Sequence, residues 1–185
     1  MTVGEVVQLV VQRLEKWEAD YLVVGAFAYF AYGIPRATKD GDFVIAASPA
    51  TLDRVLGSLP PEFEIDPQAR MELFTSTMRW VVRIAHSPLT VEFFLLGTDA
   101  HHLEEFKRRR RLWLATAKIE AWVATAEDLV IQKLRWARRK DLDDAQNILS
   151  VQGEAIDYPY IERWCAQHGT LEKLRELRAA IPPDL

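Results

Sequence analysis

Several common features are scarce in this sequence of 185 residues, and each scarcity excludes a class of protein. The single cysteine, Cys165, cannot form an internal disulfide, so the chain is not a disulfide-stabilised scaffold. No run of about 18 consecutive apolar residues occurs, which argues against a transmembrane helix and a membrane partner. The segment Met1–Glu5 starts neither a basic stretch nor an apolar one long enough for a signal peptide. We therefore expect a cytoplasmic protein.

The histidines and the cysteine do not form a recognisable metal or nucleophilic site. His101 and His102 are neighbours that cannot both face one tetrahedral metal from a helix, and no cysteine or third histidine stands at zinc-ligand spacing. Cys165 and His168 lie three residues apart in a predicted helix, with no third group to orient them for nucleophilic catalysis. Because Cys165 lies among apolar residues, we expect a buried thiol.

Positive charge is not in excess, because the formal net charge is −4. A polyanion would therefore have to meet a local basic patch. Two segments mix cations with aromatic residues: Phe106–Arg111, which is soon followed by Trp113, and Arg135–Lys140. Each could hold an RNA backbone and stack a base, or could form the solvated face of an amphipathic helix. The sequence leaves both interpretations open.

The composition, with 49% hydrophobic, 27% charged and 10% aromatic residues, is that of a folded domain. Helical spacing of apolar residues, short apolar runs and turn signals give the order of elements. The predicted helices span residues 3–18, 26–32, 49–58, 99–107, 125–138, 140–152, 157–167 and 170–180. The predicted strands span residues 21–24, 43–45, 79–86, 89–96, 109–114 and 118–124.

Capping patterns mark where two of these helices begin. Ser48 precedes a proline, as an N-cap does, and Thr125 and Asp128 form a Ser/Thr-x-x-acid pattern. We predict an α/β core over residues 1–124 and a helical C-terminal subdomain over 125–185, packed on that core. The fold class is α+β, with a small mixed sheet and flanking helices followed by a helical C-terminal half.

Asp40 and Asp42 are the first candidate functional residues. They stand two apart at the start of a predicted strand, so their side chains leave the same face of an extended backbone and can share one hard cation. Magnesium prefers such oxygen ligands. A D-x-D pair also occurs by chance in solvated loops, so its surroundings have to decide between the two interpretations.

Glu92 and Gly25 supply those surroundings. Glu92 lies in the otherwise hydrophobic strand 89–96, where an ionised carboxylate is costly unless a cation or hydrogen bonds compensate it. If that strand lies beside residues 42–45, Glu92 becomes a third carboxylate, able to act as metal ligand or general base. The alternative is an outward-facing glutamate on an edge strand. Gly25, between a strand and a helix, would let backbone amides approach a phosphate.

The segments Leu22–Ala26 and Arg36–Phe43, followed by the acidic residue of strand 89–96, resemble the nucleotidyltransferase superfamily, which has the DNA polymerase beta-like fold. They look most like the branch of AbiEii-type abortive-infection toxins and its small uncharacterised relatives. A second block, Lys133 followed by Arg138–Asp144, is similar to the Arg-x-Lys-Asp-x-x-Asp signature of that branch.

The resemblance implies transfer of a nucleoside monophosphate from a nucleoside triphosphate to a hydroxyl, with Mg²⁺ or Mn²⁺ held by Asp40, Asp42 and Glu92. The acceptor could be a tRNA, a protein or a small molecule, and a toxin–antitoxin or defence setting would add a cognate antitoxin. The residues that we expect to contact the nucleotide are Gly25, Ala26, Arg36, Thr38, Lys39, Lys133 and Lys140.

The second block allows two interpretations of its charges. Lys133 could reach triphosphate oxygens, while Lys140 or the preceding arginine could neutralise the leaving pyrophosphate. Alternatively, these cations form salt bridges between helices. Asp141 and Asp144 lie three apart on one helical face, where we expect them to cap the helix and orient Lys133 or Arg36 rather than to bind metal.

The chain departs from the superfamily pattern at Ala26. The position after the first glycine of the turn usually offers a serine hydroxyl or a second glycine, and alanine presents a backbone amide but no hydroxyl. This departure motivates a second hypothesis, in which the protein is a catalytically weak or inactive module that binds a nucleotide or a partner with the same fold.

Overall fold

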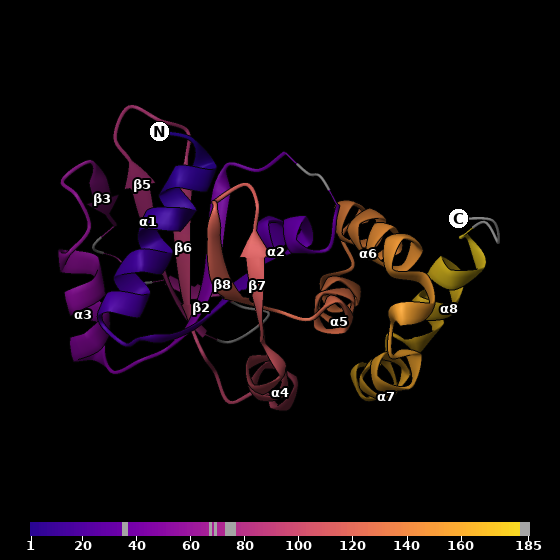
Figure 1. The fold of residues 1–185 in the computed structure, drawn as a ribbon. Helices are drawn as coiled ribbons and strands as arrows, with labels where there is room; N and C mark the ends of the chain where they lie inside the picture. Colours follow the sequence, from indigo (N-terminus) through magenta and orange to yellow (C-terminus); the bar gives the residue numbers. More distant parts are fainter. Residues whose placement is uncertain (35–36, 67, 69, 73–76, 182–185) are drawn as a thin grey trace.

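The computed structural model describes residues 1–34, 37–66, 68, 70–72 and 77–181 (Figure 1). The helices are α1 (Val3–Lys16), α2 (Gly25–Ala31), α3 (Pro49–Gly57), α4 (Ala100–Arg108), α5 (Ala126–Trp136), α6 (Arg139–Gln152), α7 (Tyr158–His168), α8 (Leu171–Ala179) and the 3-10 turn η1 (Gly153–Ala155). The strands are β1 (Asp20–Val24), β2 (Asp40–Ala46), β3 (Phe63–Ile65), β4 (Arg70–Glu72), β5 (Thr77–Ile84), β6 (Thr90–Leu95), β7 (Arg110–Leu114) and β8 (Ile119–Val123).

The strands form one mixed sheet in the order β3-β5-β6-β2-β1-β8-β7, with β4 paired to β5. β2 lies near the centre, antiparallel to β1 and parallel to β6. Helices α1 and α3 lie beside the sheet, and the C-terminal helices gather on the far side of α2 (Figure 1). The α+β fold with a mixed sheet and a helical C-terminal half is therefore as the sequence predicts. Among the described residues, none of the helices has the length and apolar character needed to cross a membrane.

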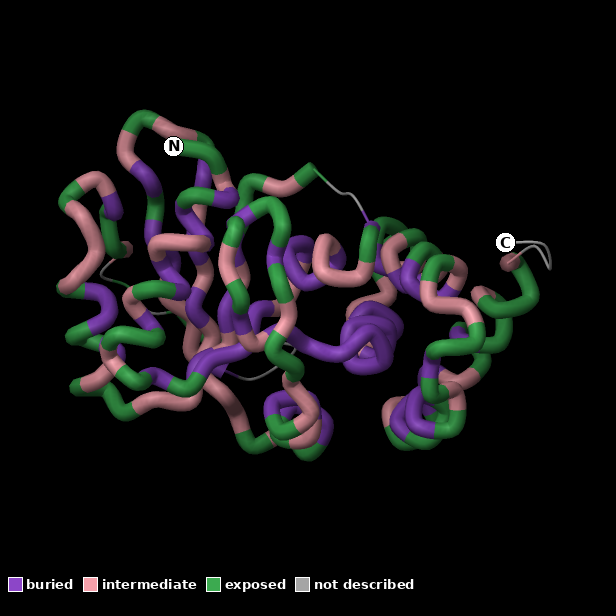
Figure 2. The backbone as a smooth tube through the Cα atoms, viewed as in Figure 1, coloured by how far each residue is buried: buried purple, intermediate pink, exposed green. Residues whose placement is uncertain are grey.

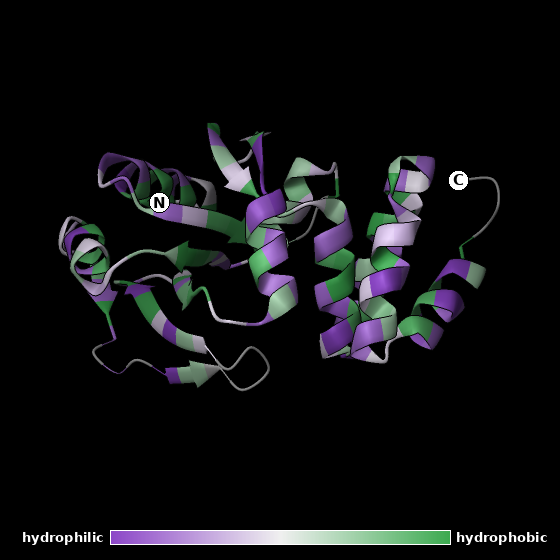
Figure 3. Cartoon of the chain, turned by 90° about the horizontal axis from the view of Figure 1, so that it is seen from below, coloured by the Kyte–Doolittle hydropathy of each residue, from purple (hydrophilic) through white to green (hydrophobic). Residues whose placement is uncertain are grey.

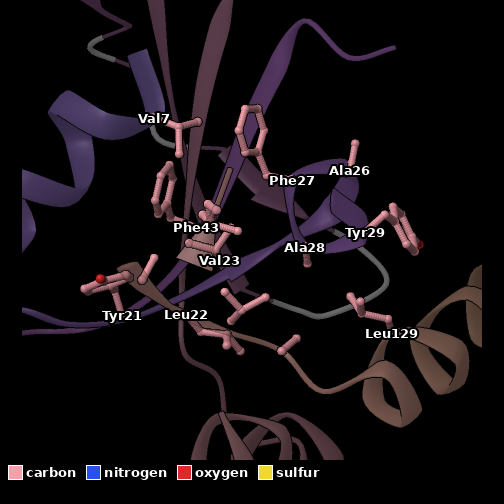
Figure 4. Close-up of a cluster of buried hydrophobic side chains, with 14 of the residues drawn as sticks. Val7, Tyr21, Leu22, Val23, Ala26, Phe27, Ala28, Tyr29, Phe43 and Leu129 are labelled. Atoms are coloured by element: carbon pink, nitrogen blue, oxygen red, sulfur yellow. The ribbon is translucent and has the colours of Figure 1, made fainter. Parts of the chain in front are cut away.

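One face of β2 belongs to the hydrophobic core. Gly41, Phe43 and Ile45 are buried, whereas the alternate residues of the strand are exposed or half-buried. The apolar side of α1 covers this face, and a Cβ on Gly41 would lie only 2.9 Å from Cγ2 of Val7. Figure 4 shows the side chains of Val7 and Phe43 in this cluster. In Figure 2 the buried stretches of the strands are purple. The other face of β2 is left for polar side chains.

Capping side chains begin several helices at the positions that the sequence indicates. Ser48 accepts a hydrogen bond from the amide of Thr51, and Thr125 accepts one from the amide of Asp128. A capping box joins Thr2 and Glu5 at the start of α1. Each cap satisfies an amide that has no partner within the helix, typically contributing about 1 kcal/mol.

The helical half packs around α5. Most of this helix is buried, including Leu129, Val130, Ile131 and Leu134, because α6 and α7 pack on it and α2 meets it from the sheet side. Figure 3 shows α5 to α8 as a group of helices with hydrophobic residues distributed along them. Cys165 of α7 is fully buried, as its apolar surroundings predict.

A buried polar cluster joins α4, α5 and α7. The carboxylate of Asp128 is fully buried and accepts hydrogen bonds from the hydroxyls of Tyr160 (2.6 Å) and Thr125 (2.5 Å). Nε2 of His101 lies 3.2 Å from the same carboxylate. Burial alone would raise the pKa of Asp128, but the bonds from His101, Thr125 and Tyr160 outweigh it and hold the pKa below its usual value.

Sequence reasoning misses two short strands, β3 and β4, and places the start of β2 too late. Both missed strands are three residues long and pair only along β5, and β3 closely follows the helix-stopping prolines at 60–61. The predicted strand 43–45 begins at Asp40, because β6 pairs with β2 from Asp40 onward. The polar residues that look like a loop are held extended by a neighbouring strand.

Glu105 of α4 gives a testable pH dependence of stability. It is 3% exposed and accepts a hydrogen bond from Nε2 of Gln132 (3.3 Å). Burial and then the charge of Asp128 raise its pKa from 4.5 to about 8. The folded state therefore favours the neutral acid, and this contribution to stability is full below the ordinary pKa and is lost as the pH rises through about 8.

We predict that Glu105→Gln removes this loss. The glutamine stays neutral, so its melting temperature should exceed that of the unmodified protein by several degrees near pH 8.5 but by much less near pH 5. Thermal unfolding of both proteins at the two pH values checks this. A difference in melting temperature that is the same at both would contradict it.

Candidate functional site

The candidate site is a cavity of about 800 Å³ between the polar face of the sheet and helices α5 and α6. Figure 1 shows how α2, at the end of β1, lies between the sheet and these helices. The predicted site residues that line the cavity are Gly25, Ala26, Thr38, Lys39, Asp40, Asp42, Glu92, Lys133 and Lys140. The remaining predicted contact, Arg36, lies outside the described residues.

The three carboxylates come together through the register of two parallel strands. Asp42 of β2 pairs with Glu92 of β6, and Asp40 pairs with Thr90, whose hydroxyl donates to the Asp40 carboxylate at 2.5 Å. The strand 89–96 therefore lies beside residues 42–45, which is the condition that makes Glu92 a neighbour of the aspartate pair. Asp40 and Asp42 share the polar face because they are two residues apart on one strand. Glu92 lies on the same face because it is directly opposite Asp42.

Gly25 is required by its contact with Asp42. Val24, the last residue of β1, pairs with Asp42, and the chain then turns through Gly25 at a φ of +62°. A Cβ at this position would lie 2.0 Å from Oδ2 of Asp42, so any other residue would force the Asp42 carboxylate to move. Glycine therefore both supplies the left-handed conformation and lets the carboxylate lie against the backbone that begins α2.

Arg79 of β5 is a site residue that sequence reasoning misses. Its Nη1 lies 3.2 Å from Oε2 of Glu92, and both side chains are half-buried in the cavity wall. The pair runs diagonally across β5 and β6, because Arg79 is opposite Phe94, two residues beyond Glu92. A cation in an apolar strand was the available signal, but its partner depends on a register that the sequence does not state.

The loop before β2 is fastened by local hydrogen bonds. The hydroxyl of Thr38 accepts from the amide of Asp40 (3.1 Å) and lies 3.2 Å from its carbonyl. The carbonyl of Lys39 accepts from the amide of Thr90 (2.9 Å), which extends the ladder between β2 and β6 by one bond. These bonds fix the backbone at Asp40, where β2 begins. The side chain of Lys39 is exposed at the cavity mouth.

Lys133 lies on the opposite wall and is almost fully buried. Its Nζ lies 2.8 Å from Oδ1 of Asp141 and 2.9 Å from Oδ2 of Asp144, so α5 and α6 are joined by ion pairs. Arg138 also bonds to Asp141 (2.5 Å). Burial would raise the pKa of Asp141, but the bonds from Arg138 and Lys133 outweigh it and hold the pKa low. Salt bridges between α5 and α6 are therefore present, and both aspartates contact Lys133. The predicted cap is wrong, because no side-chain capping hydrogen bond is present among the described residues at Arg138, the cap position of α6.

An aromatic side chain lies near both cations of this wall. The ring centre of Trp136 lies 5.5 Å from Nζ of Lys133 and 5.3 Å from the guanidinium carbon of Arg138. Nζ of Lys133 also lies 5.5 Å from the ring centre of Tyr29 in α2. Cation–π contacts of this kind attract a cation to an aromatic face by about 0.5–2 kcal/mol. The wall opposite the carboxylates is therefore both cationic and aromatic.

The carboxylates do not form a metal-binding group as they are placed. In the part of the chain that the structure describes, no three His, Cys, Asp or Glu side chains are arranged to hold a metal ion. Asp40 bonds to Thr90, and Glu92 is held by Arg79. The donor set is nevertheless one of hard oxygen ligands that face one cavity, which is the ligand type that Mg²⁺ prefers.

The basic run 106–111 is largely engaged in ion pairs rather than forming an unopposed patch. Arg109 lies 2.8 Å from Asp20, and Arg111 contacts Glu15. Such pairs reduce the charge that this segment would present to an RNA backbone.

Comparison with known proteins shows the fold and little beyond it. No family model matches the chain, and no curated protein matches its sequence. Among solved structures, a Helicobacter pylori protein proposed to be a nucleotidyltransferase has a TM-score of 0.56 at 18% identity, over 95% of this chain and 78% of that one. JHP933 from Helicobacter pylori has a TM-score of 0.55 at 17% identity, over 92% and 73% of the two chains.

A third structure is ANT(2'')-Ia in complex with adenylyl-2''-tobramycin. It has a TM-score of 0.51 at 14% identity, over 97% of both chains. At these identities the likeness concerns the arrangement of the backbone. The chain has the nucleotidyltransferase fold, and the narrower resemblance to AbiEii-type toxins stays a prediction.

Proposed function

We propose that the protein is a magnesium-dependent nucleotidyltransferase, which moves a nucleoside monophosphate from a nucleoside triphosphate to a hydroxyl acceptor. The observation that carries this proposal is the single cavity in which Asp40, Asp42 and Glu92 face the cationic wall of Lys133. The nucleotidyltransferase fold and its neighbours add support. Acids on one wall and cations on the other suit a triphosphate that is held through both a metal and direct ion pairs.

Asp40 and Asp42 would hold the magnesium ion, with manganese as an alternative. A bound divalent cation would neutralise phosphate charge and polarise the phosphorus centre. We assign to Glu92 the acceptance of the proton of the incoming hydroxyl, because its ion pair with Arg79 leaves Asp40 and Asp42 as the carboxylates for the metal. A role for Glu92 as a third metal ligand would require its ion pair with Arg79 to open.

The other cavity residues would orient the triphosphate. The backbone amides of Gly25 and Ala26, at the start of α2, line the cavity and would contact phosphate oxygens. The acceptor oxygen forms a bond to the α-phosphorus while the bond between the α- and β-phosphates breaks, and the hydroxyl proton passes to Glu92. Lys133 and Lys140 would then stabilise the charge of the leaving pyrophosphate.

The acceptor is proposed only by class: a tRNA, a protein hydroxyl or a small molecule. The structure of ANT(2'')-Ia holds an adenylylated small molecule, which supports the last of these for this fold. The exposed side chains of Lys39 and Lys140 at the cavity mouth would favour an anionic acceptor. A toxin–antitoxin or defence role, with a cognate antitoxin, rests on the sequence resemblance alone.

A second candidate function is a binding module without turnover. Two observations favour it: Ala26 lines the cavity but offers no hydroxyl, and Glu92 is engaged by Arg79. Such a module would bind a nucleoside triphosphate, or a partner, without consuming it. Measuring both binding and consumption of the triphosphate distinguishes the two functions. A module without turnover binds the triphosphate and does not consume it, whereas the enzyme does both.

Asp42→Asn tests the enzymatic proposal. It removes one charged ligand oxygen while keeping the shape of the side chain, so magnesium-dependent triphosphate consumption should fall at least about 100-fold. Asp53→Asn, the same change at an exposed position of α3, should leave the rate unaltered. The assay follows pyrophosphate release with tRNA, protein and small-molecule acceptors. Equal rates for the two variants would exclude this site as the catalytic one.

Gly25→Ala tests the packing of the site, with Gly33→Ala as its control. Both glycines have positive φ, at +62° and +77°, but a Cβ at Gly33 meets no atom of the described residues within 4 Å. The control should therefore lose about 1 kcal/mol of stability from backbone strain alone. Gly25→Ala should lose more, because its Cβ displaces the Asp42 carboxylate, and it should also lose turnover. Urea denaturation and the same rate assay measure both effects, and matching losses would refute the contact.

A further inference from the structure

A second, smaller cavity of about 70 Å³ opens off the candidate site and is not used by the proposed chemistry. The two cavities share part of their walls, formed by Val24, Gly25, Phe94, Lys133 and Trp136. The smaller one continues between the sheet, α4 and α5 and is mainly apolar. A ligand in the large cavity can therefore extend into the small one.

The pleat of two strands explains why the chemistry changes between the cavities. Along the polar face of β2, Asp42 is followed by Val44, and along that of β6, Glu92 is followed by Phe94. Two residues of a strand advance by about 7 Å. The surface thus changes from carboxylate to apolar over a distance comparable to the size of one nucleoside. Tyr29 of α2 adds an aromatic ring to the apolar part.

The inner end of the small cavity carries a hydrogen-bonding pair. Glu105 and Gln132 line it, joined by the bond from Nε2 of Gln132 to the Glu105 carboxyl. Burial raises the pKa of Glu105 to about 8, and burial also lowers the pKa of the neighbouring His102. Near neutral pH this end is therefore mainly uncharged. It can donate to and accept from a neutral polar edge, and it does not suit a phosphate.

We propose that this apolar cavity binds the base of the nucleoside triphosphate, with the Glu105–Gln132 pair contacting the polar edge of the base. The inference rests on the proposed function, because it takes the triphosphate to lie between the carboxylates and Lys133. A nucleobase is planar and apolar on its faces and carries donors and acceptors at its edge, as the rings and the polar end of this cavity require. A macromolecular acceptor would instead enter from the mouth, where Lys39 and Lys140 are exposed.

Calorimetric titration with magnesium separates the contribution of the base from that of the phosphates. The unmodified protein is titrated with ATP, GTP, CTP and UTP, and with inorganic tripolyphosphate. We expect at least one nucleotide to bind at least about tenfold more tightly than tripolyphosphate. If tripolyphosphate binds and no nucleotide binds more tightly, the inference fails while the proposed function stands. If neither binds, the proposed function itself fails.

Val44→Phe fills the apolar cavity, and Val151→Phe makes the same change at a site on α6 that is 56% exposed. The first variant should lower nucleotide affinity to that of tripolyphosphate, whose own affinity stays unchanged. The control should alter neither. Circular dichroism establishes that each variant folds.

Gln132→Leu provides a test that does not depend on filling the cavity. It keeps the size of the side chain but removes its amide, so the relative affinities of the four nucleotides should change by about three- to tenfold, with tripolyphosphate unaffected. The inference is overturned if Val44→Phe weakens nucleotide and tripolyphosphate alike and Gln132→Leu leaves the order of the nucleotides unaltered.

Discussion

The pairing of β2 between β1 and β6 is the interaction on which the rest of the structure depends. It places Val24, Asp42 and Glu92 on three neighbouring strands at one level of the sheet. β1 is antiparallel to β2 and β6 is parallel to it, so the end of β1 meets the starts of the other two. The turn at Gly25 and the helix that follows are thereby placed against the Asp42 carboxylate. A site assembled in this way needs no long loops, because the ladder itself sets the spacing.

The charges of the site are balanced in layers. The acids on the sheet are met by Thr90 and Arg79 from the sheet itself, while Lys133 is met by Asp141 and Asp144 from α6. The buried Lys133 and the half-buried Glu92 each have a partner on their own side of the cavity, which offsets the cost of removing them from water. A ligand that enters between the walls has to exchange some of these pairs for its own. Binding would then depend strongly on ionic complementarity and only weakly on the net charge of the chain.

Sequence reasoning reaches most of the fold because the local signals here are strong. The helical spacing of apolar residues predicts the helices, Ser48 and Thr125 mark the starts of two of them, and short apolar runs predict the central strands. The aspartate pair and Glu92 are identifiable because acids are unusual beside such strands, and the structure brings them into one cavity.

What sequence reasoning misses depends on long-range register. Arg79 acquires its role from a diagonal neighbour on β6, and Glu105 from a helix that is distant in the sequence. The sequence predicts that Gly25 admits a phosphate, and the structure places a carboxylate of the same chain, that of Asp42, against Gly25. Such partners are set by how elements pack, and local patterns in a single sequence do not encode them.

The alternation along β2 has a consequence for how this protein can vary. The core-facing residues Gly41, Phe43 and Ile45 are interleaved with Asp42 and its neighbours within one strand of seven residues. Loss or gain of one residue there would exchange the two faces, turning an acid toward α1 and an aromatic ring toward the cavity. The residues that β2 gives to the core and those that it gives to the cavity therefore cannot change face independently. This strand can tolerate substitutions, but an insertion or deletion of one residue would disrupt both faces.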